Sequence, residues 1–253
     1  MKFAAWLLFA GILARCNSYG LYDKLASPGS GSSGTGAGCT DSGAGIVKNG
    51  LVAFWNLNGN FNDKWDCGTS FQTGTGSNIA FVADRFGVAG NAVNLAVSTG
   101  LVGFGNIPEY QTSPFSVCAW IRIVSGSGTF DAVKKHDGTN GWKIDVRNAA
   151  IYADAFLGNT GVASVSGTGM GNTWGYTCLT IDTTANPALV LYAAPYGGSL
   201  ANFTAATASF TGTATNLELA SNVSSPLEYD DVAFYKRALT SAEVQQNFIA
   251  TEQ

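Results

Sequence analysis

The segment that most constrains the fold lies near the end of the chain, at residues 227–249. Residues 227–235 alternate with a period of two, which predicts a β-strand with one buried face. Val232 and Phe234 share that face, and Asp231, Ala233 and Tyr235 are expected on the other. Any fold for this chain must therefore bury one face of residues 227–235 in a hydrophobic core.

After a short turn the spacing changes from that of a strand to that of a helix. Thr240 and Glu243 have the spacing of a capping box, in which each side chain binds a backbone N–H of the other residue. Leu239 and Val244 flank the cap as a hydrophobic staple, and Val244 and Phe248 form one apolar stripe. The chain is thus expected to end as strand, turn and short helix.

The rest of the chain reads as short strands separated by glycine-containing turns. The sequence holds 32 glycines in 253 residues, and only 12 % of the residues are charged, a composition typical of β-proteins with many turns. Asp137-Gly138 and Asn140-Gly141 are turn signals between two such strands. We predict an all-β fold, a two-sheet antiparallel β-sandwich with a short C-terminal helix. Strands are expected near residues 129–134, 142–147, 150–156, 173–182, 188–193, 203–210 and 216–220.

The charge of the chain bears on its partners. The formal net charge is −4 and no run of Lys or Arg occurs, whereas a nucleic-acid partner requires a basic surface. We therefore expect no nucleic-acid ligand. The single histidine, His136, disfavours a histidine-based metal site or nucleophile.

The first residues have the proportions of an export signal. In residues 1–16 one lysine precedes about a dozen apolar residues, a stretch too short to span a membrane. The run from Leu13 to Cys16 looks like a bacterial lipobox, with Arg15 where a small residue is usual. Lipidation of Cys16 would place the protein in the outer membrane, at the cell surface or at the periplasmic face. The alternative is ordinary signal cleavage, with Cys16 incidental. A tether is expected at residues 17–45, rich in Gly and Ser from Ser27 onward.

Four landmarks in the remaining residues carry a family resemblance. Residues 230–239 read Asp-Asp-Val-Ala-Phe-Tyr-Lys-Arg-Ala-Leu, and they precede the helix with Glu243. The other landmarks lie at residues 50–63, 84–93 and 115–122, the last containing Ala119-Trp120. Together they resemble laminin G-like jelly-roll domains of the concanavalin A-like lectin/glucanase superfamily. The resemblance implies one such domain at residues 46–253, with a non-enzymatic binding or adhesion role and a carbohydrate or glycoprotein ligand.

A likeness to pentraxins, relatives of the same fold, concerns the cysteines. It implies a disulfide between Cys118 and Cys178, each of which shares a strand face with aromatic residues. Two buried thiols are the alternative. Cys39 and Cys67 are then left for a second bond, which would tie the tether to the first loop.

Calcium is the one cofactor that the resemblance suggests. Asp137 and Asn140 stand where pentraxins place an Asp-Asn ligand pair, and Asp63 or Asp230 would suit a single structural calcium, which prefers oxygen ligands. Turn chemistry is the alternative for Asp137 and Asn140, and Asp230 can instead cap a turn or pair with Arg237.

Aromatic residues are the candidates for sugar binding. A sugar needs an exposed aromatic platform with polar partners, and Trp120, Trp142, Trp174, Tyr152 and Tyr176 are candidates for it. Burial in the core is the alternative for each, because jelly-roll sheets also bury large aromatics.

An enzymatic role would need paired carboxylates. Glucanases of the superfamily carry Glu-x-Asp-x-x-Glu on one strand, and Glu228 with Asp230 approaches this motif without the second glutamate. The alternatives to a binding module are thus an unusual or degenerate glycoside hydrolase and a structural envelope lipoprotein. An exposed aromatic cluster at a loop rim would favour the binding module, and a carboxylate pair about 5–9 Å apart on one sheet face would favour the hydrolase.

Overall fold

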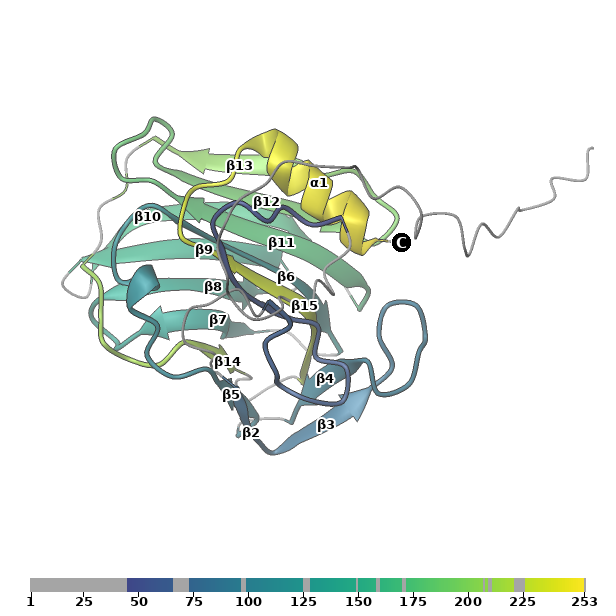
Figure 1. Cartoon of the computed structure of the whole chain (residues 1–253). Helices are drawn as coiled ribbons and strands as arrows, with labels where there is room; N and C mark the ends of the chain where they lie inside the picture. Colours follow the sequence, from purple (N-terminus) through teal and green to yellow (C-terminus); the bar gives the residue numbers. More distant parts are fainter. Residues whose placement is uncertain are drawn as a thin grey trace, which may run out of the picture. The chain divides into compact units, whose positions relative to one another are not determined.

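The fold was obtained as a computed structural model, which describes residues 45–65, 73–96, 99–124, 128–148, 150–157, 160–169, 172–206, 208, 211–220 and 226–252. In these residues two antiparallel sheets pack face to face, and the helix α1 (Ser241–Thr251) lies against one of them (Figure 1). The prediction of an all-β sandwich with a short C-terminal helix is confirmed. No helix in this part of the chain is long and apolar enough to cross a bilayer.

The sheet that α1 covers, here called the helix-side sheet, contains eight strands in the described residues. Its order is β13-β12-β11-β6-β15-β4-β3, and β1 pairs with β15 beside this path. The strands are β1 Leu51–Trp55, β3 Ile79–Val82, β4 Ala92–Leu95, β6 Phe115–Ile123, β11 Trp174–Ile181, β12 Leu189–Pro195, β13 Ala201–Ala205 and β15 Leu227–Tyr235.

The opposite sheet has the order β10-β9-β8-β7-β14-β5-β2 among the described residues. Its strands are β2 Thr75–Ser77, β5 Leu101–Gly103, β7 Thr129–His136, β8 Gly141–Arg147, β9 Ala150–Leu157, β10 Thr160–Gly169 and β14 Glu218–Ala220, and the 3₁₀ helix η2 is Pro108–Tyr110. The predicted turn between β7 and β8 is present, with Asp137 N–H donating to Asn140 O at 3.2 Å. Gly141 ends this turn at φ +112°, where a Cβ atom would lie 2.0 Å from Lys135 O, so only glycine fits.

A bulge in β15 decides which strands it pairs with. Leu227–Tyr229 pair with β4 and residues 232–235 pair with β1, and the register of β15 against β6 shifts between Asp230 and Ala233. Asp231 adopts φ +47° at this point. Because a bulge turns a side chain away from simple alternation, Asp230 and Asp231 are able to bind the same partner, Arg85.

The core between the two sheets contains the aliphatic and aromatic residues predicted to face inward. Val232 and Phe234 are fully buried there, as are Phe115, Val117, Ala119 and Ile121 of β6. Trp55 packs on Phe104 with ring centroids 4.0 Å apart. This core therefore holds the strand face that the alternation of residues 227–235 identifies.

The second core lies between the helix-side sheet and α1. Tyr235, Ala233, Trp120, Tyr176, Val244 and Phe248 are buried in it. The prediction of a single buried face on the last strand is wrong, because α1 covers the other face as well (Figure 1). The side chain of Asn247 fixes the helix by accepting from Val47 N at 2.8 Å and donating to Tyr235 Oη at 2.9 Å.

The capping box at the start of α1 is confirmed. Glu243 N donates to Thr240 Oγ1 at 3.3 Å, and Thr240 N donates to Glu243 Oε2 at 2.9 Å. Arg237 adds a bidentate ion pair, with Nη1 and Nη2 donating to the two oxygens of Glu243 at 2.8 and 2.6 Å. Leu239 and Val244, the predicted staple, are both buried.

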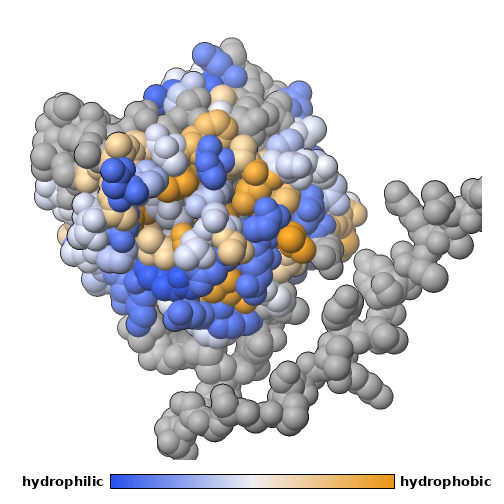
Figure 2. Space-filling model, turned by 90° about the horizontal axis from the view of Figure 1, so that it is seen from above, coloured by the Kyte–Doolittle hydropathy of each residue, from blue (hydrophilic) through white to orange (hydrophobic). Residues whose placement is uncertain are grey.

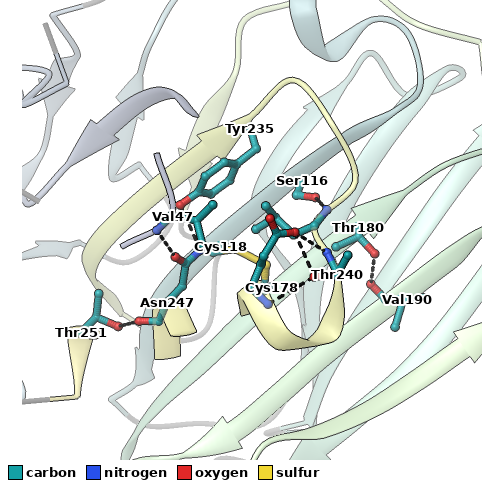
Figure 3. Close-up of a disulfide and its surroundings, with 12 residues drawn as sticks. Val47, Ser116, Cys118, Cys178, Thr180, Val190, Tyr235, Thr240, Asn247 and Thr251 are labelled. Atoms are coloured by element: carbon teal, nitrogen blue, oxygen red, sulfur yellow. Dashed lines mark hydrogen bonds between the residues drawn. A yellow bond between two sulfur atoms is a disulfide. The ribbon is translucent and has the colours of Figure 1, made fainter. Parts of the chain in front are cut away.

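The predicted disulfide between Cys118 and Cys178 is present. The two residues are direct register partners of β6 and β11, and the bond lies in the core beneath α1 (Figure 3). The proposed partners Cys39 and Cys67, the lipidation candidate Cys16, and residues 1–44 of the signal and tether lie outside the described residues.

Candidate functional site

Four of the five aromatic residues considered for ligand binding are buried, and the fifth, Tyr152 of β9, is partly exposed. Trp120 and Tyr176 lie under α1, Trp142 lies between the sheets, and Trp174 is only 6 % exposed. The prediction that they form an exposed platform is therefore wrong. The sequence correctly predicted that the aromatic residues of β6 and β11 lie opposite the aliphatic face. The face that carries the aromatic residues, however, is covered by α1.

A different pair of aromatic residues is exposed. Phe86 is 43 % exposed and Tyr196 is 44 % exposed, and their ring centroids lie 6.2 Å apart at 77°. Phe86 belongs to the turn between β3 and β4, and Tyr196 follows β12. Figure 2 shows apolar patches among polar side chains on the face viewed from above in Figure 1. We call Phe86 and Tyr196 the aromatic rim.

The turn that carries Phe86 is held by its own backbone and by Asp84. The Oδ1 atom of Asp84 accepts from the N–H groups of Phe86 and Val88 at 2.8 and 2.9 Å. Gly87 adopts φ +83° and has open space where a Cβ would stand. The Phe86 ring is thus presented by a rigid turn with no side chain beside it at residue 87.

Tyr196 is fixed from two sides. Its N–H donates to Trp174 O at 2.8 Å, and the next residue, Gly197, donates to Glu252 Oε1 at 2.9 Å. The Tyr196 ring also lies 5.9 Å from the Trp120 ring, centroid to centroid. The end of α1 therefore supports this half of the aromatic rim.

Arg85 connects Phe86 of the aromatic rim with buried carboxylates of β15. Its guanidinium binds the carboxylates of Asp230 and Asp231, and its Nε donates to Thr251 O at 2.7 Å. It also lies 4.5 Å from the centroid of the Phe86 ring. Burial, the largest cause, raises the pKa of Asp230 and of Asp231, and Arg85 opposes it. Asp230 thus binds Arg85 rather than the predicted Arg237, which pairs with Glu243.

A row of polar side chains crosses the helix-side sheet next to the aromatic rim. Glu228 of β15 is the register partner of Asn94 on β4 and of Arg122 on β6, and Arg122 is the partner of Trp174 on β11. Asn94 Nδ2 donates to Glu228 Oε1 at 3.2 Å, Arg122 forms an ion pair with Glu228, and its Cζ lies 5.4 Å from the Trp174 ring centroid. We call Asn94, Glu228, Arg122 and Trp174 the polar row.

Two of the carboxylates considered for calcium, Asp137 and Asp63, accept hydrogen bonds from nearby backbone N–H groups. Asp137 Oδ1 accepts from Thr139 N and Asn140 N at 2.8 and 2.7 Å, and these bonds, with one from Thr213, lower its pKa to about 2. Asp63 Oδ1 accepts from Phe54 N and Trp65 N at 2.9 and 2.8 Å. Within the described ranges no three His, Cys, Asp or Glu side chains gather in an arrangement able to hold a metal ion.

A carboxylate pair that the sequence analysis did not identify lies on the outer face of the opposite sheet. Asp145 of β8 and Asp154 of β9 both bind Nη2 of Arg147, and both are buried. Burial, followed by the charge of Asp154, raises the pKa of Asp145. Lys143 Nζ lies 3.4 Å from Asp145 Oδ2 and 2.9 Å from Asp131 Oδ1. Alternation along β8 predicts that Asp145 and Arg147 share one face. The position of Asp154 beside them depends on the pairing of β8 with β9, which alternation does not predict.

Comparison with known proteins adds information on the fold. No protein-family model and no curated protein match this chain. Solved structures do match. The botulinum neurotoxin serotype G binding domain has a TM-score of 0.60 at 14 % identity, covering 79 % of this chain and 51 % of that one.

Two further solved structures resemble this chain to a similar extent. The binding domain of Paraclostridial Mosquitocidal Protein 1 has a TM-score of 0.62 at 13 % identity, covering 79 % of this chain and 52 % of that one. The binding domain of botulinum neurotoxin DC, solved in complex with SialylT, has a TM-score of 0.59 at 15 % identity, covering 81 % and 51 %. The chain thus spans about half the length of these solved chains. Likeness at such low identity shows the fold alone, which is that of a β-sandwich domain.

Proposed function

We propose that this protein is a non-enzymatic binding module that takes a carbohydrate or glycoprotein ligand at the aromatic rim of Phe86 and Tyr196. The observation that carries the proposal is the exposure of both rings on rigid turns at one end of the sandwich. Neighbouring exposed aromatic rings form an apolar patch, and such a patch beside polar residues often marks a binding site.

The chemistry of sugars suits this surface. The C–H faces of a pyranose ring are apolar and pack against aromatic rings, and its hydroxyl groups need nearby hydrogen-bonding partners. The aromatic rim supplies the rings, and the polar row supplies an amide, a carboxylate and a guanidinium beside it. Because the turns are held by Asp84 and Glu252, the rings lose little freedom when a ligand binds.

The comparisons and the motifs add support of different kinds. The solved neighbours are binding domains of toxins, one of them solved with SialylT, and this favours a binding role by analogy of fold. The laminin G-like resemblance favours the same role. Export, lipidation at Cys16 and display at the cell surface belong to the proposal on the strength of residues 1–16.

A glycan array tests the proposal. We expect the purified protein to bind a defined set of glycans, and the Phe86→Ala/Tyr196→Ala double variant to lose that binding. Tyr152→Ala is the matched control, because Tyr152 is a partly exposed aromatic residue of β9 on the opposite sheet. Arrays with calcium and with a chelator show whether the proposed structural calcium takes part. Equal binding by the double variant and the wild type would overturn the assignment of the site.

The hydrolase alternative has one observation in its favour, the Asp145–Asp154 pair on one sheet face. Arg147 lies between the two carboxylates, and neither faces open solvent. Release of reducing sugar from array ligands by the wild type, but not by Asp145→Asn, would establish hydrolysis. We expect no release from either protein.

A further inference from the structure

The polar row contains two hydrogen-bond donors for which the described part of the chain offers no partner. Among the described residues, neither Nε of Arg122 nor Nε1 of Trp174 has an acceptor, and both atoms are buried. A buried N–H without an acceptor costs stability, so folded proteins retain few such groups. Two of them occur here on directly paired residues of neighbouring strands.

The position of these donors links them to the aromatic rim. The carbonyl oxygen of Trp174 accepts from Tyr196 N at 2.8 Å, so the indole belongs to the residue that supports the exposed tyrosine. The Arg122 side chain is 34 % exposed and its guanidinium lies 5.4 Å from the indole centroid. A ligand that accepts from the indole N–H therefore also meets the partly exposed side chain of Arg122.

The charge of the row selects the kind of ligand. The guanidinium of Arg122 is already neutralised by the buried carboxylate of Glu228, which also accepts from Asn94. An anionic ligand would have to approach Glu228 and compete with it for the same guanidinium. A neutral ligand with hydroxyl groups meets no such opposition, since it accepts from the two N–H groups and donates to Glu228.

We propose that Arg122, Trp174 and Glu228 form a polar subsite that recognises adjacent hydroxyl groups of a neutral sugar whose ring packs against Phe86 and Tyr196. This inference rests on the proposed function and narrows its ligand to an uncharged glycan. One hydroxyl oxygen accepts from Trp174 Nε1, and a neighbouring hydroxyl group donates to Glu228 and accepts from Arg122.

The variant Trp174→Phe tests the subsite with little change of shape. It removes the unpartnered N–H and keeps an aromatic ring in the core. We expect a loss of affinity of at least tenfold for the preferred neutral glycan, with a thermal midpoint equal to or above that of the wild type. A donor with a merely structural role would give the reverse, a lower midpoint and unchanged affinity.

Arg122→Lys is the second variant, because it keeps the positive charge beside Glu228 and removes the Nε donor and the planar guanidinium. We expect a similar loss of affinity. The matched control is Arg147→Lys on the opposite sheet, where an arginine also pairs with buried carboxylates. That change should leave glycan affinity within twofold of the wild type.

The glycan array separates failure of this inference from failure of the proposed function. Neutral glycans should bind, and their sialylated or sulfated counterparts should bind at least fivefold more weakly. A preference for anionic glycans, or wild-type affinity in Trp174→Phe, would overturn the subsite while the loss in Phe86→Ala/Tyr196→Ala still upheld the aromatic rim. Absence of binding to any glycan would overturn both.

Discussion

The rings of Phe86 and Tyr196 meet edge to face at 6.2 Å, although the two residues lie on turns far apart in the sequence. Each of the two turns is hydrogen-bonded separately to residues 251–252. Arg85, beside Phe86, binds Thr251 O, and Gly197, beside Tyr196, binds Glu252. The end of the sequence, which determines the last strand and the helix, thus also sets the spacing of the exposed rings.

Replacing Arg85 with methionine should destabilise the protein by about 3–5 kcal/mol at pH 7, because Asp230 and Asp231 would be left buried without their cation. The cost should shrink at acid pH, where the two carboxyl groups take up protons. Denaturant unfolding of the variant at both pH values measures this. Lys236→Met, which removes an exposed cation, should change the free energy of unfolding by less than about 0.5 kcal/mol.

Phe248 and Ile249 are neighbours on α1 with opposite environments, since Phe248 is buried in the helix-side core and Ile249 is 47 % exposed. Phe248→Ala should lower the free energy of unfolding by about 3–5 kcal/mol, and Ile249→Ala by less than about 0.5 kcal/mol. Equal effects of the two changes would mean that α1 does not cover the sheet.

The double variant Cys118→Ala/Cys178→Ala should lose about 4 kcal/mol of stability, because the disulfide closes a loop with a sequence separation of 60 residues. Intact-mass measurement with and without alkylation should show no free thiol at either position in the wild type. Alkylation of both residues under non-reducing native and unfolded conditions would refute the bond.

Glu243 gives the capping box a defined pH dependence. Its hydrogen bonds, those from Arg237 first, lower its pKa from 4.5 to about 2. The folded protein therefore holds this carboxyl group ionised where the unfolded chain would protonate it, and the stability it adds is lost as pH falls from about 4.5 to about 2. Because the group is partly exposed to solvent, we expect about 1 kcal/mol.

The comparison of wild type with Glu243→Gln isolates this contribution. The difference between their free energies of unfolding should be largest near pH 7 and should vanish near pH 2. A difference that stays constant or grows at acid pH would contradict the role given to Glu243.

The strands and the helix that the sequence predicted well are those with strong local signals. The alternation in β15 and the capping box at Thr240 need no knowledge of distant residues. β10 was not predicted, because Thr160–Gly169 is rich in small polar residues and glycine, and only its pairing with β9 makes it a strand. The strands β2, β3 and β5 were also missed, because three or four residues are too few to show a clear alternation.

The candidate site depends on contacts that alternation does not encode. Alternation placed Asp230 and Asp231 on opposite faces, whereas the bulge and the positive φ of Asp231 bring both to Arg85. Alternation also correctly placed Trp120 on the face opposite the aliphatic residues. It does not show that α1 packs over the face that carries Trp120. Phe86-Gly87 and Tyr196-Gly197 were visible as aromatic residues in glycine turns, a signal too common to identify a site by itself.

The central claim is that ligand binding takes place at the aromatic rim, and isothermal titration with the glycan preferred on the array tests it most directly. The Phe86→Ala/Tyr196→Ala variant, with an unchanged circular dichroism spectrum, should bind at least a hundredfold more weakly than the wild type, and Tyr152→Ala should bind within twofold of it. Wild-type affinity in the double variant, or a loss confined to Tyr152→Ala, would contradict the account.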